Sequence, residues 1–304
     1  MNLLEMSPPL VSVCIPTYNG SNFLAYALES ISIQTYLSIE VIVSDDGSQD
    51  KTLDIAFQYS AHPIRIYAHG RLGPVENWNF CIRQAAGKYI KFLFQDDYLE
   101  STCIQRLVTA AEADPGIGLV FSPRYLKIDD DLGYASSLRG LHLSWSHLNS
   151  VQQGLDLLKD PALVKVPYNK IGEPTNTLIS KQVFDAIGIF DPFFQQLPDL
   201  EMWFRIMQTY QVAFVSEPLS TFRVHREQET ARNSQAGNHA WQEVYWIWMK
   251  MLNHPDFSEL PHLVRFRVKK ELYVGLAREF IHSVRRDPWK RIGLMHLIRC
   301  SLMS

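Results

Sequence analysis

Two pairs of aspartates stand at corresponding points of the sequence. Asp45-Asp46 follows the apolar run Val41-Ile42-Val43, and Asp96-Asp97 follows the run Tyr89–Phe94. One such pair alone often only ends a strand or caps a helix. Four carboxylates at one sheet edge, however, repel one another unless cations or hydrogen-bond donors lie between them. Carboxylate oxygens favour Mg²⁺ or Mn²⁺, ions that usually also hold substrate phosphates, so the pairs indicate a phosphorylated substrate bound through a metal.

The motifs of two common nucleotide-binding classes are missing. No Gly-x-Gly-x-x-Gly follows the first expected strand, where Asn19-Gly20-Ser21 is too short for it. No Gly-x-x-x-x-Gly-Lys-Ser/Thr occurs in the sequence. These absences argue against a dinucleotide-dependent dehydrogenase and against a P-loop enzyme.

The carboxylate pairs can meet only if the strands before them lie in one sheet. The first 125 residues alternate between short apolar runs and stretches with helical periodicity. Strands are expected at 10–15, 41–43, 64–67, 89–94 and 117–121, and helices at 23–31, 52–59, 75–86 and 99–113. This alternation predicts right-handed crossovers and a mostly parallel sheet, whose ligands bind beyond the carboxyl ends of the strands. Both aspartate pairs and Pro16–Asn19 fall at that edge.

Later parts of the chain carry a weaker pattern. Residues 124–173 are expected to form loops around a short helix near 151–158. Further elements are expected as strands at 175–180 and 212–215, helices at 181–187 and 199–210, and helical structure from residue 240.

The composition excludes several classes of protein. The chain has 304 residues, of which 46% are hydrophobic and 20% are charged, as in ordinary globular proteins. Its apolar runs are too short to cross a bilayer, and its first nine residues contain no Lys or Arg, so no signal peptide is expected. The four cysteines have the spacing of neither a disulfide framework nor a zinc site. A cytoplasmic location is therefore expected.

The net charge of −3 hides an uneven distribution. From residue 261 onward ten Lys or Arg accompany three Asp or Glu, whereas the residues before them include 19 basic and 29 acidic side chains. An acidic body argues against nucleic acid as the partner. In the basic tail, apolar residues from Trp289 onward follow helical spacing. Two interpretations stay open: a helix that packs on the acidic body, or one that contacts an anionic membrane surface and lies near lipid-linked acceptors.

Five segments of the chain, in the right order, resemble family 2 glycosyltransferases with the GT-A fold. They are Val11–Gly20 (VSVCIPTYNG), Val41–Asp50 (VIVSDDGSQD), Ala86–Ile90 with Gln95-Asp96-Asp97, Pro198–Arg205 (PDLEMWFR) and Phe222–His225 (FRVH). The third leads into the family's metal-binding D-x-D motif, and the fourth resembles its acceptor-side helix. The resemblance spans about residues 10–230.

The resemblance implies an α/β fold of the GT-A type, a three-layer α/β/α sandwich around a mostly parallel sheet. It places the glycosyltransferase domain at 1–235, with a nucleotide-binding half at 10–125 and an acceptor half at 126–235. Residues 236–304 are expected to form a helical C-terminal extension.

The family's residue roles transfer by position. The donor nucleotide is expected to contact six residues: Pro16, Tyr18, Asn19, Asp45, Asp46 and Asp96. Among these, Asp46 is preferred for the base. Asp97 is expected to ligate a divalent metal, Mn²⁺ or Mg²⁺, and His225 either approaches that metal or is a packed structural histidine. Asp199 is expected to be the general base. Because a charged group at a sheet edge is not core, loss of Asp97 is expected to leave the fold intact.

The chain departs from the family pattern in two places. Gln95 replaces the first acid of D-x-D, and an amide adds no charge for a metal. Pro198 replaces a Glu and leaves Asp199 in the first helical turn, where the helix N-terminus lowers its basicity. Glu201 is the alternative base, or else a buried partner of Arg205. A two-residue step turns about 200° around a helix, so Asp199 and Glu201 cannot share one face.

The expected activity is transfer of one sugar from a nucleotide-diphosphate sugar, with UDP as first choice, to a hydroxyl of a saccharide or lipid-linked acceptor. The resemblance implies inversion at the anomeric carbon, and a role in cell-surface polysaccharide or glycolipid synthesis at the inner face of the membrane. Two alternatives stay open. A nucleotidyltransferase also uses paired acids and a metal, but should show a Gly-rich loop with Arg or Lys where this chain has Pro16–Gly20. A non-catalytic sugar- or nucleotide-binding protein of the same fold has no need of Asp96, Asp97 and Asp199.

Overall fold

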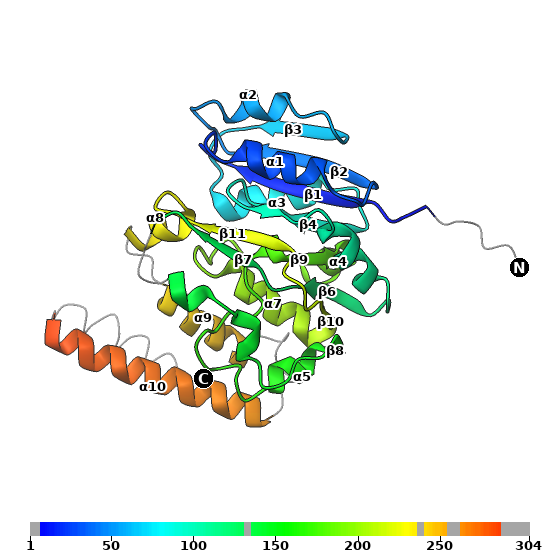
Figure 1. Ribbon diagram of the computed structural model, residues 1–304. Helices are drawn as coiled ribbons and strands as arrows, with labels where there is room; N and C mark the ends of the chain where they lie inside the picture. Colours follow the sequence, from blue (N-terminus) through cyan, green and yellow to red (C-terminus); the bar gives the residue numbers. More distant parts are fainter. Residues whose placement is uncertain (1–6, 131–134, 236–239, 254–261, 287–304) are drawn as a thin grey trace, which may run out of the picture.

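A computed structural model describes residues 7–130, 135–235, 240–253 and 262–286 (Figure 1). Its main sheet has the strand order β3-β2-β1-β4-β9-β6-β10-β8. These strands are β1 (Val11–Thr17), β2 (Ile39–Asp45), β3 (Ile64–Ala68), β4 (Tyr89–Phe92), β6 (Ile117–Phe121), β8 (Val151–Gln153), β9 (Thr177–Ser180) and β10 (Gln211–Phe214). Strands β1 to β4 are mutually parallel, whereas β9 runs antiparallel to both β4 and β6, and β8 runs antiparallel to β10.

Helices cover both faces of this sheet and make the three-layer α/β/α sandwich that the family resemblance implies (Figure 1). Helices α1 (Leu24–Ser32), α2 (Thr52–Phe57) and α4 (Cys103–Ala111) pack on one face. The other face carries α3 (Pro74–Gln84), α5 (Gly154–Lys159), α6 (Lys181–Ile187) and α7 (Pro198–Thr209). Most of these elements lie within a few residues of the expected ones, because each apolar run is buried where its periodicity indicates.

Odd- and even-numbered residues of the central strands face opposite sides of the sheet. Val13, Ile15 and Val41 pack with the α1 and α4 face, whereas Cys14 and Ile42 pack with the α3 and α7 face. Successive side chains of a strand point to opposite faces, so even-numbered residues at the ends of β1, β2 and β4 point toward α3.

A second, three-stranded sheet was not expected from the sequence. It has the order β5-β11-β7, from β5 (Tyr98–Leu99), β7 (Tyr125–Ile128) and β11 (Ser220–Val224). Strand β11 pairs antiparallel with β5 through Ser220 with Leu99 and Thr221 with Tyr98. Because β5 follows Asp97 directly and β11 precedes His225 directly, this pairing brings two distant candidate residues together.

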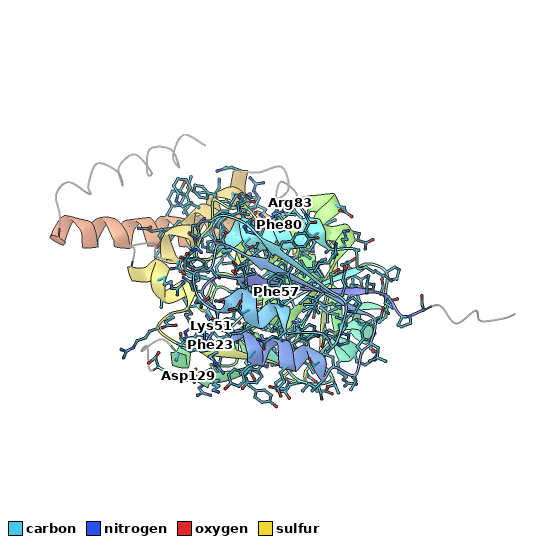
Figure 2. All side chains as sticks on the ribbon, turned by 90° about the horizontal axis from the view of Figure 1, so that it is seen from above. Phe23, Lys51, Phe57, Phe80, Arg83 and Asp129 are labelled. Carbon is cyan, nitrogen blue, oxygen red and sulfur yellow. The ribbon has the colours of Figure 1, made fainter. Side chains whose placement is uncertain are left out.

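The C-terminal part is helical where the structure describes it, with α8 (Glu229–Gln235), α9 (Ala240–Asn253) and α10 (His262–Arg286). Val244, Trp248 and Met251 of α9, and Val268 of α10, belong to the same hydrophobic cluster as the sheet. In the view from above, α10 reaches beyond the rest of the molecule (Figure 2). The expected terminal helix from Asp287 onward lies outside the described residues. Among those that are described, no helix has the length and apolar character needed to cross a bilayer.

Candidate active site

A cavity of about 580 Å³ opens at the carboxyl ends of β1, β2 and β4. Five of the expected site residues line it: Pro16, Tyr18, Asp46, Asp96 and Asp199. Strand β9 runs in the opposite direction, so the residues before it, including Glu173, also reach this edge. Helix α7 leads into β10, which is parallel to β6, and this direction places the N-terminal end of α7 at the cavity.

The two residues of the first aspartate pair have different surroundings: Asp45 is hydrogen-bonded within the fold, and Asp46 lines the cavity. Asp45 accepts hydrogen bonds from the Thr17 hydroxyl at 3.0 Å, and from the backbone N–H of Ser48 at 2.9 Å, so it fastens the turn after β2 to β1. Asn19 has a similar role, because its side-chain oxygen accepts from the Gln49 N–H at 2.8 Å. Neither residue lines the cavity; Asp46, the preferred residue for the base, does.

Asp46 is part of a cluster that suits a planar, hydrogen-bonding ligand. Its oxygens accept from the backbone N–H groups of Leu72 at 2.5 Å and Gly73 at 3.1 Å, and Arg71 Nη1 lies 3.2 Å away. The Arg71 guanidinium carbon is 3.4 Å from the centre of the Tyr18 ring. An aromatic face, a carboxylate and a half-exposed cation thus meet at one end of the cavity. Nothing in the sequence singled out Arg71, because it lies in a loop without periodicity.

Gln95 holds the loop after β1 rather than standing in for a metal ligand. Its Oε1 accepts from the Tyr18 backbone N–H at 2.9 Å, and its Nε2 donates to the Tyr18 carbonyl at 3.1 Å. A Cβ atom on Gly20 would lie 2.1 Å from Gln95 Oε1, so a side chain at this position would displace the Gln95 amide. Gln95, which replaces the first acid of the D-x-D motif, therefore positions the loop that carries the Tyr18 ring.

Asp96 and His225 form a pair at the cavity. His225 Nε2 and Asp96 Oδ2 are 2.9 Å apart, and Asp96 lines the cavity while His225 is buried behind it. The His225 ring packs on Phe23, with 4.5 Å between ring centres; Phe23 precedes α1 and is labelled in Figure 2. The other ring nitrogen of His225, Nδ1, is buried without a hydrogen-bond partner among the described residues.

Asp97 is placed differently from the expectation. It is fully buried, its Oδ2 accepts from the Thr175 hydroxyl at 2.7 Å, and its Oδ1 accepts from the Arg223 N–H at 3.0 Å. Burial, reinforced by the neighbouring charge of Asp96, raises the pKa of Asp97. The Thr175 hydroxyl and the Arg223 N–H thus hold Asp97 in the interior, whereas the neighbouring Asp96 lines the cavity. The role of Asp97 as a metal ligand stays a prediction, whereas its full burial corrects the expectation that Asp97 is not core.

The pair of Asp96 and His225 supplies two side chains of the kinds that divalent metals accept as ligands. A carboxylate and an imidazole are both accepted ligands of such ions. Among the residues that the structure describes, no group of three or more His, Cys, Asp or Glu side chains is arranged to hold a metal. Two protein ligands are enough when the remaining ones come from substrate phosphates and water, which is usual for Mg²⁺.

Asp199 lies in the first turn of α7 with only 8% of its surface exposed. Its Oδ2 accepts from Asn169 Nδ2 at 2.8 Å, and its Oδ1 accepts from the Leu200 N–H at 2.8 Å. Burial raises the pKa of Asp199 to about 7, and the hydrogen bonds only partly offset that effect. The expectation that the helix start makes Asp199 a weaker base is therefore reversed, since desolvation outweighs the helix N-terminus.

Glu201 points away from the cavity and is the buried partner of Arg205. Its Oε1 lies 2.8 Å from Arg205 Nε, and its other neighbour is Lys250 Nζ at 2.5 Å. Arg205 in turn donates to the carbonyls of Ile187 and Ile189. This confirms the structural interpretation of Glu201, because the two-residue step from Asp199 turns it to the far side of α7.

Three further polar residues of the cavity lie outside the expected set of site residues. Glu173 lines the cavity beside a buried Arg124, whose Nη2 donates to Glu173 Oε1 at 2.8 Å. Asn169 holds Asp199, and Arg232 lines the cavity from α8. Turn-forming residues around Glu173 indicate a loop there, but no sequence pattern indicates Asn169 or Arg232. The rest of the fold brings such residues to the site.

Comparisons with known proteins agree with this geometry. The model of the family described as "Glycosyl transferase family 2" matches residues 12–187. An uncharacterized protein of Mycobacterium tuberculosis is 33% identical over 225 residues, which are 74% of this chain and 70% of that protein. An uncharacterized glycosyltransferase of Rickettsia typhi is 30% identical over 223 residues, 73% of this chain and 66% of the relative. The chain thus spans about two thirds of the length of these relatives.

Solved structures share the fold at low sequence identity. S. aureus TarS in complex with UDP-GlcNAc has a TM-score of 0.68 and 15% identity, over 94% of this chain and 79% of that one. The mannosyltransferase PcManGT from Pyrobaculum calidifontis, in complex with GDP-Man and Mn²⁺, has a TM-score of 0.58 and 16% identity, over 98% and 82% of the chains. These similarities establish the GT-A fold.

Proposed function

The chain belongs to glycosyl transferase family 2, and we propose that it transfers one sugar from a UDP-sugar to an acceptor hydroxyl with inversion at the anomeric carbon. One observation carries the proposal. A single cavity holds Tyr18 and Asp46 at one end and Asp199, a carboxyl group with its pKa raised to about 7, in another part of its wall. Asp96 follows β4, which lies between β1 and β9 in the sheet. We therefore expect Asp96 to lie between the part of the cavity with Tyr18 and Asp46 and the part with Asp199.

The donor nucleotide is proposed to bind where Tyr18, Asp46 and Arg71 meet. A base can stack on the Tyr18 ring while Asp46 accepts its N–H group, and Arg71 is free to move from the ring toward phosphate, since it is half exposed. UDP is the first nucleotide to test, because TarS was solved with UDP and with UDP-GlcNAc. PcManGT was solved with GDP-Man, so GDP-sugars are the second choice.

Asp96 and His225 are the residues proposed to hold a divalent ion. When bound, such an ion neutralises the charge that develops on the leaving diphosphate. An imidazole ligand suits transition ions better than Mg²⁺, so Mn²⁺ is expected to serve better than Mg²⁺. The Mn²⁺ in the PcManGT structure supports the same choice.

Asp199 is proposed to act as the general base. The acceptor oxygen bonds to the anomeric carbon while the bond from that carbon to the diphosphate oxygen breaks. The electron pair of the broken bond leaves with the diphosphate, and the hydroxyl proton passes to the Asp199 carboxylate. A single attack from the side opposite to the leaving group inverts the anomeric carbon. A base whose pKa lies near the working pH contributes roughly 10²–10⁴ in rate.

The division of labour along the chain is also a proposal. Residues 10–125 would bind the nucleotide, residues 126–235 the acceptor, and residues 236–304 would form the helical extension. A role in cell-surface polysaccharide or glycolipid synthesis at the inner face of the membrane follows from an acceptor that is lipid-linked.

A screen of nucleotide sugars tests the function directly. The protein is incubated with UDP- and GDP-sugars, with Mn²⁺, Mg²⁺ or a chelator, and release of the nucleoside diphosphate is measured. We expect Mn²⁺-dependent release of UDP, slow with water alone and faster with an acceptor. Binding without release indicates a non-catalytic protein. Pyrophosphate released from a nucleoside triphosphate and a sugar phosphate indicates a nucleotidyltransferase instead.

A further inference from the structure

A residue from the C-terminal part of the chain holds the loop that leads into α7. The backbone N–H groups of Gln195, Gln196 and Leu197 all donate to the side-chain carboxylate of Glu243, which lies in α9. The backbone nitrogens of Gln195 and Leu197 lie 2.7 Å from Glu243 Oε1 and Oε2, respectively, and that of Gln196 lies 3.0 and 2.9 Å from the same two oxygens. Hydrogen bonds to an ionised acceptor are among the strong ones, so Glu243 fixes this loop to α9.

The held loop forms part of the cavity wall beside the proposed base. Residues 195–197 line the cavity, as do Pro198 and Asp199, the first two residues of α7. Only Pro198 separates the loop from Asp199 in the chain, so a shift of the loop is passed on to the Asp199 carboxylate. The Glu243 charge also lies near the N-terminal end of α7, where a negative charge is favourable.

Helix α9 is itself packed against α7. The ring of Trp248 stacks on that of Phe204 in α7, with 5.5 Å between the ring centres. Lys250 Nζ lies 2.5 Å from Oε1 of Glu201, which is also in α7. Glu243 and Lys250 are seven residues apart, so they lie on the same side of α9. The Glu243 carboxylate therefore reaches the loop from a helix with a fixed position relative to α7.

Two observations distinguish Glu243 from a residue that only attaches α9 to the body. Ala240, one turn before Glu243, lines the cavity, so the first turn of α9 belongs to the cavity wall. Lys250, by contrast, pairs with Glu201 and Asp191, which are not among the residues that line the cavity. Helix α9 thus has one contact that attaches it and another that reaches the site.

We propose that Glu243 is a positioning residue for sugar transfer. It holds residues 195–197, and through them the start of α7, so that the Asp199 carboxylate meets the hydroxyl that it deprotonates. The inference rests on the proposed function and extends the reaction site past residue 235 into α9. Catalysis is sensitive to such positioning, since a misplacement of about 1 Å can lower the rate about 100-fold.

Glu243→Gln tests this role. The side chain keeps its length, but one oxygen becomes an NH₂ group, which cannot accept from a backbone N–H. At least one N–H group of the loop then loses its acceptor. Release of UDP from UDP-GlcNAc is measured with Mn²⁺ and with water as the acceptor. We expect kcat to fall about 10- to 100-fold, whereas KM for UDP-GlcNAc stays unchanged because the proposed nucleotide contacts are untouched.

Lys250→Met is the matched control. Methionine keeps most of the length of the side chain but removes the ion pair to Glu201, so the attachment of α9 weakens while residues 195–197 keep their acceptor. This variant should unfold at a lower urea concentration than the parent protein and retain the parent's kcat. Both variants weaken contacts between α9 and the body, so a purely structural role of Glu243 predicts similar kinetics for the two.

Hydrogen–deuterium exchange followed by mass spectrometry gives a readout that needs no turnover. Peptides that cover residues 195–197 should exchange faster in Glu243→Gln than in the parent protein, because their N–H groups have lost an acceptor. The same peptides should exchange no faster in Lys250→Met than in the parent protein.

Three results would overturn the proposal: a kcat in Glu243→Gln equal to that of the parent protein, an equal loss of kcat in both variants, or unchanged exchange of the loop in Glu243→Gln. A parent protein that releases nucleotide from no sugar donor contradicts the proposed function instead, and the exchange experiment still reports whether Glu243 holds the loop.

Discussion

His225 Nε2 lies 2.9 Å from Asp96 Oδ2, although 129 residues separate the two in the chain. The pairing of β11 with β5 produces this contact, since Asp96 precedes β5 and His225 follows β11. The same pairing brings the Arg223 N–H to Asp97 and thereby turns Asp97 into a structural residue. Adjacent aspartates thus have different roles, one at the cavity and one in the interior.

Asp96→Asn should abolish the effect of Mn²⁺ on UDP binding. An amide keeps the size of the side chain but removes the charge that a divalent ion requires. Calorimetric titration of UDP with and without Mn²⁺ measures the difference, and a cooperative thermal unfolding transition of the apoprotein checks that the variant is folded. Asp129→Asn, an aspartate outside the cavity lining, serves as the control. An unchanged Mn²⁺ response in Asp96→Asn would exclude Asp96 as a ligand.

Asp97→Ala should destabilise the protein rather than only inactivate it. The change leaves the Thr175 hydroxyl and the Arg223 N–H buried without their acceptor. Each such loss costs about 1–3 kcal/mol, so we expect a total of about 2–6 kcal/mol in the free energy of unfolding. Urea denaturation monitored by tryptophan fluorescence gives this value. A variant as stable as the parent protein contradicts the burial of Asp97.

Sugar transfer should depend on pH through Asp199. The base is active when ionised, so kcat/KM is expected to rise with pH and level off above about pH 7, the pKa of Asp199. Asp199→Asn should lose transfer and retain UDP affinity. Asp54→Asn is the matched control, because Asp54 also lies in the first turn of a helix but is exposed and outside the cavity. A pH profile that is flat from 5 to 9 argues against Asp199 as the base.

The same group makes stability depend on pH in a defined direction. The folded-state pKa of Asp199 is about 7, above the ordinary value of 3.8. A raised carboxyl pKa means that the contribution of Asp199 to stability is full below about pH 4 and is lost as pH rises through 7. Relative to Asp199→Asn, the parent protein should therefore lose ~2 kcal/mol of stability between pH 5 and pH 8. Denaturation of both proteins at the two pH values measures this, and an opposite sign would refute the burial argument.

Gly20→Ala should weaken nucleotide binding by disturbing Gln95. The added Cβ lies 2.1 Å from Gln95 Oε1, so the amide must move and its two bonds to Tyr18 are lost. We expect UDP affinity to fall about tenfold, which corresponds to about 1.4 kcal/mol. Gly70→Ala is the control, since a Cβ at Gly70 has no neighbour within 4 Å. Equal UDP affinities in the two variants would show that the Gln95 contact does not position Tyr18.

The basic tail offers a separate test of membrane contact. The full chain is expected to co-sediment with anionic liposomes at low salt, and a chain that ends at Arg286 should do so less. Each basic group near an anionic surface is worth about 1 kcal/mol, and salt screens this attraction. Equal sedimentation of both proteins would leave only the interpretation that the tail packs on the body.

Much of the fold was predictable because it depends on local periodicity. The apolar runs that become β1, β2, β4 and β6 and the stretches that become α3 and α7 indicate the layers directly. The direction of these strands then places Asp46 and Asp96 at one edge, because carboxyl ends of parallel strands lie together, whereas Asp199 was expected there only from the family resemblance.

The tertiary structure alone decided which residues of that edge face the cavity. Strands β2 and β4 are buried on both faces, so their apolar pattern does not distinguish Asp45 from Asp46, or Asp96 from Asp97. Strand β11 pairs across more than a hundred residues, and no local pattern reports such a partner. The pKa of Asp199 depends on how completely the surrounding chain excludes water, whereas the sequence shows only the helix start beside it. Periodicity is a local property, but register and desolvation are properties of the assembled chain.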